Sequence, residues 1–187
     1  HTRFRNVTGV QTCALPILPL DATRFPAADI YDRAAGDIIA ALDAGQDVAA
    51  LCEGDPFLYG SFAYLFERVA RTHKVEVVPG ITSLAASAAR LATPLALRNQ
   101  SLAIIPAPLD DEAIAARLRE ADAAVIMKLG RHAGRVRALL TRLGRADTAL
   151  YIEHATMADE RALPLAEAPE AAPYFSLLVL PAREKAR

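Results

Sequence analysis

The sequence has no tryptophan and little sulfur, since 187 residues contain two cysteines and two methionines. Two thiols, Cys13 and Cys52, are too few for a disulfide framework or a cysteine zinc cluster, so a reducing, cytoplasmic setting is expected. No apolar run approaches the roughly 18 residues of a membrane-spanning helix, and no membrane partner is expected. A formal net charge of -1 also counts against a nucleic-acid-binding protein, which would be basic.

What the chain does contain is typical of a globular protein. Hydrophobic residues make up 53% and charged residues 23% of the sequence. The length allows one large domain or two small ones with a sizeable core.

Residues 1–18 differ from the rest because their apolar residues follow neither a helical nor a strand period. They resemble the translated adapter sequence found at the ends of sequenced gene fragments. We therefore expect a non-native segment that is poorly packed, with a genuine irregular tail as the alternative.

Apolar runs of strand length alternate with stretches whose apolar residues recur at helical spacing. This alternation predicts an α/β fold. The connector at 93–100 divides the prediction into domains at 19–98 and 99–187. Strands are expected at 48–51, where both faces would be buried, and at 74–78, 102–105, 123–127, 149–152 and 175–180. Helices are expected from Asp29 to a stop at Gly45, at 62–69, after Thr82, after Asp110 and at 132–143.

The loop Cys52–Ser61 joins the first of these strands to a helix. Gly54 allows a ligand or another backbone to approach closely, since it has no Cβ. Asp55 precedes Pro56, which favours an extended backbone there. Loops at the carboxyl ends of strands are common ligand sites in α/β proteins, so this loop is expected to bind a small polar molecule.

Four segments, in this order and spacing, resemble the tetrapyrrole (corrin/porphyrin) methyltransferases, which use S-adenosylmethionine. They are Gly54–Gly60, Val75–Ser83, Val125–Lys128 and Tyr151–Met157. The resemblance covers about Leu20 to Ala182, and it implies two α/β domains with the cofactor cleft between them. Within the family, Leu51–Phe62, Lys128–His132 and Pro173–Ser176 are most similar to enzymes that methylate C20 of precorrin-2 in cobalamin (vitamin B12) biosynthesis.

The resemblance also implies which residues bind. The residues implied at the cofactor are Glu53, Gly54, Asp55, Leu58, Thr82, Ser83, Met127 and Ala155. Taken alone, Met127 would be core packing and Thr82 a helix cap. Lys128 and Arg131 are expected to meet the substrate carboxylates, and Arg135, Arg137 and His132 belong to the same basic cluster.

Methylation of a meso carbon also requires the loss of a proton, but no catalytic residue is assigned. Glu53, Asp55, His132 and His154 are candidate bases by residue type alone. No metal site is predicted.

One departure from the family concerns the N-terminal part. The family begins with a strand and a G-x-G-x-G-D-P loop, and no such motif precedes Asp29. We therefore expect a truncated enzyme whose first domain lacks its leading strand and has an unpaired sheet edge. The full-length protein is expected to be a homodimer, as in the family.

Three alternatives remain open at this point. The enzyme could act on cobalt-factor II, the metal-loaded substrate. The chain could be a catalytically incompetent fragment that keeps part of the cofactor site. A nucleotide-binding regulator would need a phosphate-binding loop, and none is visible.

Overall fold

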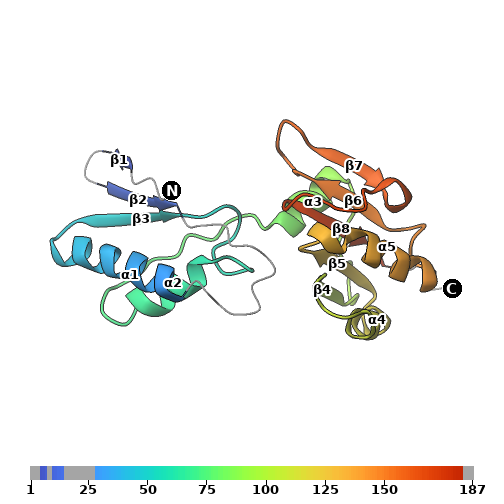
Figure 1. Cartoon of the computed structure of the whole chain (residues 1–187), viewed down its shortest axis with the longest axis horizontal. Helices are drawn as coiled ribbons and strands as arrows, with labels where there is room; N and C mark the ends of the chain where they lie inside the picture. The colour runs from blue at the N-terminus through green and yellow to red at the C-terminus, as the bar shows by residue number, and fades with distance from the viewer. Residues whose placement is uncertain (1–4, 8–9, 15–27, 183–187) are drawn as a thin grey trace. The chain divides into compact units, whose positions relative to one another are not determined.

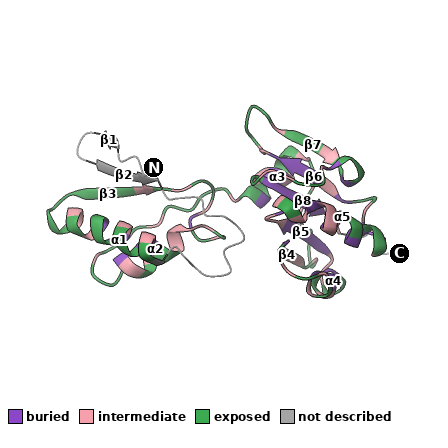
Figure 2. Ribbon diagram, viewed as in Figure 1, coloured by how far each residue is buried: buried purple, intermediate pink, exposed green. Residues whose placement is uncertain are grey.

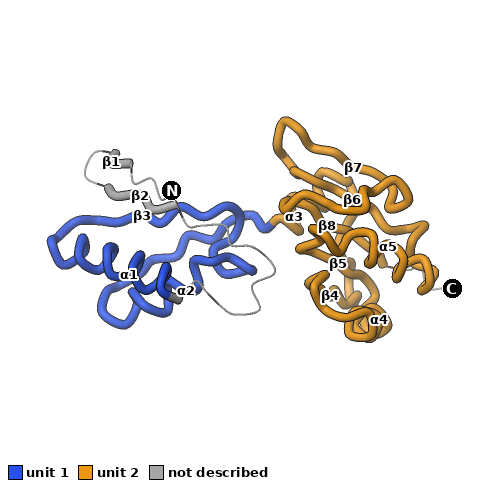
Figure 3. The backbone as a smooth tube through the Cα atoms, in the orientation of Figure 1, with its two compact units in different colours: residues 1–82 blue, residues 83–187 orange. Residues whose placement is uncertain are grey.

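The structure is a computed structural model that describes residues 5–7, 10–14 and 28–182. It divides into two compact units, His1–Thr82 and Ser83–Arg187 (Figure 3). Along the chain, the boundary between the units lies between Thr82 and Ser83, whereas the sequence pattern placed the domain boundary after residue 98. The helix that follows Thr82 thus belongs to the second unit.

Unit 1 combines a three-stranded sheet with two helices. The strands are β1 (Arg5–Val7), β2 (Val10–Ala14) and β3 (Asp47–Leu51), in the order β1-β2-β3. β2 runs antiparallel to β1 and parallel to β3. The helices α1 (Ala28–Asp43) and α2 (Phe62–Val69) lie on one face of this sheet (Figure 1).

The core of unit 1 follows from the apolar spacing of its helices. Tyr31, Ala35 and Ile38 recur along α1 and are buried with Leu65 and Val69 of α2.

The predicted stop of α1 at Gly45 is confirmed. Gly45 has a φ of 75°, and its N–H donates to the Leu42 carbonyl at 2.9 Å. The Gln46 N–H donates to the Ala41 carbonyl at 3.0 Å, which completes a Schellman motif. The predicted cap is wrong, because Asp29 lies inside the first turn of α1 rather than before it.

Three expectations for unit 1 need correction. Residues 1–18 were expected to be a poorly packed segment without a strand period, yet residues 5–7 and 10–14 form β1 and β2. β2 pairs with one edge of β3, where a leading strand was expected to be missing. β3 is not buried on both faces, because its residues alternate between exposed and half-buried and Leu51 is 64% exposed. The non-native origin of residues 1–18 stays a prediction.

The third correction concerns residues 74–78, which form no strand. Val75 packs against the core of α1 and α2, while Lys74, Glu76 and Val78 are exposed. The alternating pattern therefore comes from an extended segment that is half-buried on the helices, with no ladder partner among the described residues.

Unit 2 is built on a five-stranded sheet in the order β4-β5-β8-β6-β7. Its strands are β4 (Leu102–Pro106), β5 (Ala123–Met127), β6 (Leu150–Glu153), β7 (Arg161–Pro164) and β8 (Ser176–Leu180). Its helices are α3 (Ser83–Arg90), α4 (Asp111–Glu120) and α5 (Ala133–Arg142), with short turns η1 (Gly130–His132) and η2 (Leu165–Glu167). The predicted strands and helices of this half are confirmed.

The centre of unit 2 is more deeply buried than β3 of unit 1 (Figure 2). Every residue of β8 is buried, and so are the first four residues of β5. Asp110 caps α4 as predicted, since its Oδ1 accepts a hydrogen bond from the Ala113 N–H at 2.7 Å. Among the described residues, no helix is both long and apolar enough to cross a bilayer.

The strand directions in unit 2 bring several loops to one edge. β5 and β6 are both antiparallel to β8, so they point the same way, and β4 is parallel to β5. The carboxyl ends of β4, β5 and β6 therefore lie at one edge, where β8 begins. We call it the carboxyl edge of unit 2, and it comprises residues 107, 127–128, 153–155 and 174–176.

Candidate functional site

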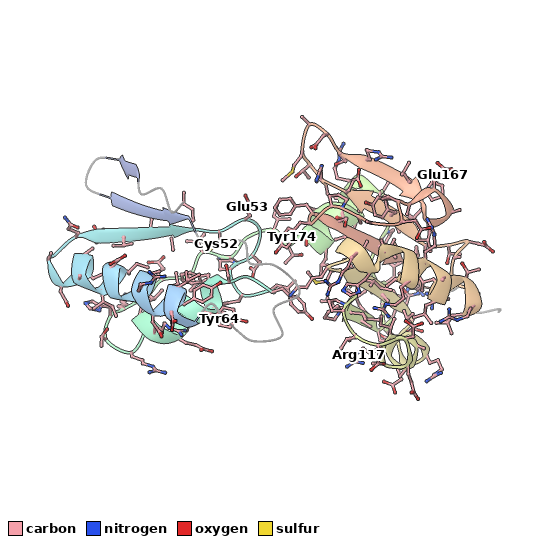
Figure 4. The ribbon with its side chains drawn as sticks, viewed as in Figure 1. Cys52, Glu53, Tyr64, Arg117, Glu167 and Tyr174 are labelled. Carbon is pink, nitrogen blue, oxygen red and sulfur yellow. The ribbon has the colours of Figure 1, made fainter. Side chains whose placement is uncertain are left out.

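In unit 1, the candidate site is a pair of loops. The first, residues 52–61, follows β3, and Figure 4 labels Cys52 and Glu53 at its start. Asp55 Oδ1 accepts hydrogen bonds from the N–H groups of Phe57 at 2.9 Å and Leu58 at 3.0 Å. Asp55 Oδ2 accepts one from the Gly80 N–H at 3.3 Å, which joins the first loop to residues 78–82. We call residues 52–61 and 78–82 the loop pair.

Two glycines allow the loop pair to meet backbone to backbone. A Cβ on Gly80 would lie 2.2 Å from the carbonyl oxygen of Gly54, a distance that no side chain can occupy. Gly54 has a φ of 78°, which is unfavourable for residues with a Cβ. Of the residues implied at the cofactor, the structure thus brings together Glu53, Gly54, Asp55, Leu58 and Thr82.

The Asp55 carboxylate has a positioning role in this arrangement. Hydrogen bonds from the backbone of Phe57, and then of Gly80 and Leu58, lower its pKa. Both oxygens are thus already engaged, Oδ1 within the first loop and Oδ2 between the two loops, which gives no support to Asp55 as the proton acceptor. Burial, and then the charge of Asp55, raises the pKa of the neighbouring Cys52 thiol.

In unit 2, the candidate site lies at the carboxyl edge, where two strands end in unusual backbone conformations. Lys128 follows β5 with a φ of 59°, and His154 follows β6 with a φ of 50°. Residues other than glycine seldom adopt such values, and when they do, they cluster at ligand sites. Met127, at the end of β5, is half-buried, and its carbonyl accepts a hydrogen bond from the Ala107 N–H at 2.8 Å.

Ala155 lies in the next loop, residues 154–160, which we call the Ala155 loop. Its neighbours His154 and Thr156 have φ values of 50° and 70°. The His154 N–H donates to the Phe175 carbonyl at 2.8 Å, and His154 Nδ1 lies 2.6 Å from Asp159 Oδ2. The Thr156 N–H donates to Glu160 Oε2 at 2.6 Å. Ala155 is thus held between two constrained residues.

An ion pair connects this loop to α3, the helix that begins at Ser83. Arg90 Nε donates to both carboxylate oxygens of Glu160, at 2.9 and 2.8 Å. The N–H of Thr156, and then Arg90, lowers the pKa of Glu160. The structure thus joins the Ala155 loop to the helix that Ser83 begins.

The basic cluster separates into two groups. Arg135 contacts Asp111 and the carbonyls of Ala107 and Leu109, and Arg137 contacts Glu170 and the carbonyl of Ala168. Both side chains therefore connect α5 to neighbouring segments of unit 2, Arg135 to residues 107–111 and Arg137 to residues 168–170.

Lys128, Arg131 and His132 form the second group, at and just after the end of β5. Lys128 is half-buried, and burial lowers its pKa. Arg131 is exposed in η1. Burial, and then the charges of Arg135 and Arg131, lowers the pKa of His132.

Sequence reasoning missed two groups in unit 2. Glu153 is buried, and it accepts hydrogen bonds from the Tyr151 hydroxyl and from Arg161 Nη1, the latter at 3.0 Å. The sequence signal that could have revealed Glu153 is its position as a carboxylate at the end of an apolar strand. The Arg90–Glu160 pair was also missed, and its partners are 70 residues apart, so no local pattern could reveal it.

These features define an α/β protein with constrained loops at the ends of its strands, a position at which α/β proteins commonly bind small molecules. The sequence profile of the tetrapyrrole (corrin/porphyrin) methylases matches residues 6–169, and the chain belongs to this family.

Three relatives show how far the similarity extends. The cobalamin biosynthesis protein CobIJ of Mycobacterium tuberculosis is 44% identical over 154 residues, which are 82% of this chain and 30% of CobIJ. The precorrin-2 C(20)-methyltransferase of Sinorhizobium sp. is 40% identical over 154 residues, 82% of this chain and 63% of that protein. The cobalt-precorrin-2 C(20)-methyltransferase of Salmonella typhimurium is 33% identical over 176 residues, 92% of this chain and 73% of that protein. The chain thus spans less than a third of the length of CobIJ.

Solved structures show the same fold. The methyltransferase CobJ superposes with a TM-score of 0.64 at 21% identity, over 84% of this chain and 73% of CobJ. The uroporphyrin-III C-methyl transferase of Thermus thermophilus, complexed with S-adenosyl homocysteine, has a TM-score of 0.60 at 26% identity, over 80% of this chain and 72% of that one. The predicted family and α/β fold class are confirmed, while the cofactor cleft between domains stays a prediction.

Proposed function

We propose that the chain belongs to an S-adenosylmethionine-dependent methyltransferase that acts on C20 of precorrin-2 in cobalamin biosynthesis. The observation that carries this proposal is the similarity to two proteins named for C20 methylation, which are 40% and 33% identical over 82% and 92% of this chain. The cytoplasmic location and the homodimer expected from sequence are part of the same proposal.

The residues present fit S-adenosylmethionine. A purine and a thioether chain need apolar walls, with backbone donors and acceptors between them. Next to the Gly54–Gly80 contact, Val78 and Ile81 are 74% and 75% exposed, which is unusual for large apolar side chains. We assign cofactor contacts to the loop pair and to Ser83, Met127 and Ala155. When bound, the cofactor supplies an electrophilic methyl group on its sulfonium sulfur.

The chain's own contribution to the reaction is binding and orientation. Rigid loops that fix the two reactants in line and exclude water lower the barrier without a change in chemistry. The hydrogen bonds of Asp55 and of Glu160 provide that rigidity.

Lys128 and Arg131 are proposed to bind carboxylates of the tetrapyrrole. Their support is their position at and just after the end of β5.

A cobalt-loaded substrate is the second candidate, supported by the name of the Salmonella typhimurium relative. The experiment has two stages. Calorimetry with S-adenosylhomocysteine tests the cofactor, and failure to bind would favour the incompetent fragment. Single-turnover assays with precorrin-2 and with its cobalt complex then test the substrate. Transfer of one methyl group to C20 of either form is expected, and transfer to another position would overturn the C20 assignment.

A further inference from the structure

The Ala155 loop keeps an unfavourable backbone conformation on both sides of one residue. His154 and Thr156 have φ values of 50° and 70°. The value at Thr156 is the more costly one, because threonine is branched at Cβ and rarely adopts the left-handed region. Among the described residues, no other position lies between two non-glycine residues with positive φ. Such a conformation persists only where surrounding contacts determine it.

The carboxylate of Glu160 makes several of the contacts that fix this backbone conformation. Glu160 Oε2 accepts a hydrogen bond from the Thr156 N–H at 2.6 Å, and the Glu160 side chain is only 15% exposed. The same carboxylate receives Arg90 Nε at 2.9 and 2.8 Å. We call this arrangement, from Arg90 through Glu160 to the Thr156 N–H, the Arg90–Glu160 clamp.

The clamp differs from another ion pair of unit 2. Arg142 Nη2 lies 2.6 Å from Asp111 Oδ2, and this contact joins two helices, α5 and α4. In the clamp, the carboxylate also bonds the peptide directly after Ala155. Charge-assisted bonds of this kind are stronger than neutral ones, so the clamp can offset the cost of the conformation at Thr156.

We propose that the Arg90–Glu160 clamp positions the Ala155 peptide for the cofactor, so that Arg90 and Glu160 are positioning residues. The inference rests on the proposed contact between Ala155 and S-adenosylmethionine. Without the clamp, the loop relaxes to more ordinary backbone conformations. Only a fraction of molecules then holds the binding conformation, and the apparent affinity falls by that fraction.

Three substitutions in the full chain separate this role from general stability. Glu160→Ala removes both the ion pair and the Thr156 bond. Arg90→Gln removes the ion pair alone, and because Arg90 is 55% exposed, its loss leaves the core intact. Arg142→Gln is the matched control, since it removes an arginine–carboxylate contact of the same unit that does not touch the Ala155 loop.

The measurements are the dissociation constant for S-adenosylhomocysteine, by calorimetry, and hydrogen exchange of the Thr156 amide. We expect Glu160→Ala to weaken binding by about tenfold and to speed exchange at Thr156. Arg90→Gln should weaken binding less, and Arg142→Gln should leave both readouts unchanged.

Wild-type affinity in both Glu160→Ala and Arg90→Gln would overturn the proposal, whether or not exchange at Thr156 becomes faster. Equal losses in Arg90→Gln and Arg142→Gln would also overturn it, because the effect would then be general. Lack of S-adenosylhomocysteine binding by the wild-type chain would instead contradict the proposed cofactor role, and the clamp's role with it. If Glu160→Ala fails to fold, Arg90→Gln decides between these outcomes.

Discussion

The loop pair of unit 1 and the Ala155 loop of unit 2 reach constrained geometries by different means. In unit 1, two backbones meet because Gly54 and Gly80 have no Cβ, and one carboxylate, Asp55, joins them. In unit 2, His154 and Thr156 adopt left-handed conformations although they have a Cβ, and the Arg90–Glu160 pair bonds the N–H of Thr156. Close approach at glycines costs backbone entropy on folding but puts no strain on the folded chain. Left-handed residues with a Cβ carry strain that other contacts must offset. Unit 1 should therefore be sensitive to added atoms and unit 2 to lost contacts.

The largest effect is expected from Gly80→Ala. The new Cβ would lie 2.2 Å from the Gly54 oxygen, so the two loops must separate. Overpacking of this kind costs about 1–3 kcal/mol, and if the whole cost falls on binding, affinity for S-adenosylhomocysteine falls by about fivefold to 150-fold. Gly36→Ala is the control, because a Cβ on Gly36 meets nothing within 4 Å, and it should bind normally. Unchanged binding by Gly80→Ala would show that the loop pair is not part of the cofactor site.

A second effect should appear in the stability of unit 2. Tyr151→Phe removes a hydroxyl that donates to the buried Glu153 carboxylate. Loss of a partner to a buried charged group costs about 1–3 kcal/mol, so the midpoint of thermal unfolding should fall. Tyr174→Phe alters an exposed ring and should leave the midpoint unchanged. A wild-type midpoint in Tyr151→Phe would mean that Arg161 alone satisfies Glu153, and that unit 2 tolerates lost contacts better than the comparison implies.

These differences explain how much could be predicted from sequence. The loop at 52–61 was found because Gly54 and the Asp55–Pro56 step are local signals of backbone geometry, but its contact with Gly80 was not predicted. Most strands and helices were found because their apolar spacing is local too. The segment at 74–78 was wrongly predicted as a strand, because a half-buried extended chain shows the same alternation of apolar and polar residues. The clamp was missed because it depends on two charged residues in different elements, each of which resembles an ordinary surface residue.

The third prediction concerns pH and the loop pair. Backbone hydrogen bonds hold the pKa of Asp55 below its ordinary value. Its contribution to stability is thus fully present above that ordinary value, near 3.9, and is lost as the pH falls through the lower pKa of the folded state. Asp55→Asn should be less stable than the wild type at pH 7, and the difference should disappear in acid. Thermal unfolding across this range measures it, and a difference that did not change with pH would contradict the role of the Asp55 charge.

The smallest effect is expected at the exposed end of the basic cluster. Arg131→Glu should raise KM for the tetrapyrrole several-fold and leave S-adenosylhomocysteine binding unchanged, because an exposed charge acts in a high dielectric. Arg117→Glu, an equally exposed reversal on α4, is the control for net charge. An equal rise of KM in both variants would mean that general electrostatics attract the substrate. A rise in Arg131→Glu alone, reduced by added salt, would assign Arg131 to substrate binding and separate that role from the loops that bind the cofactor.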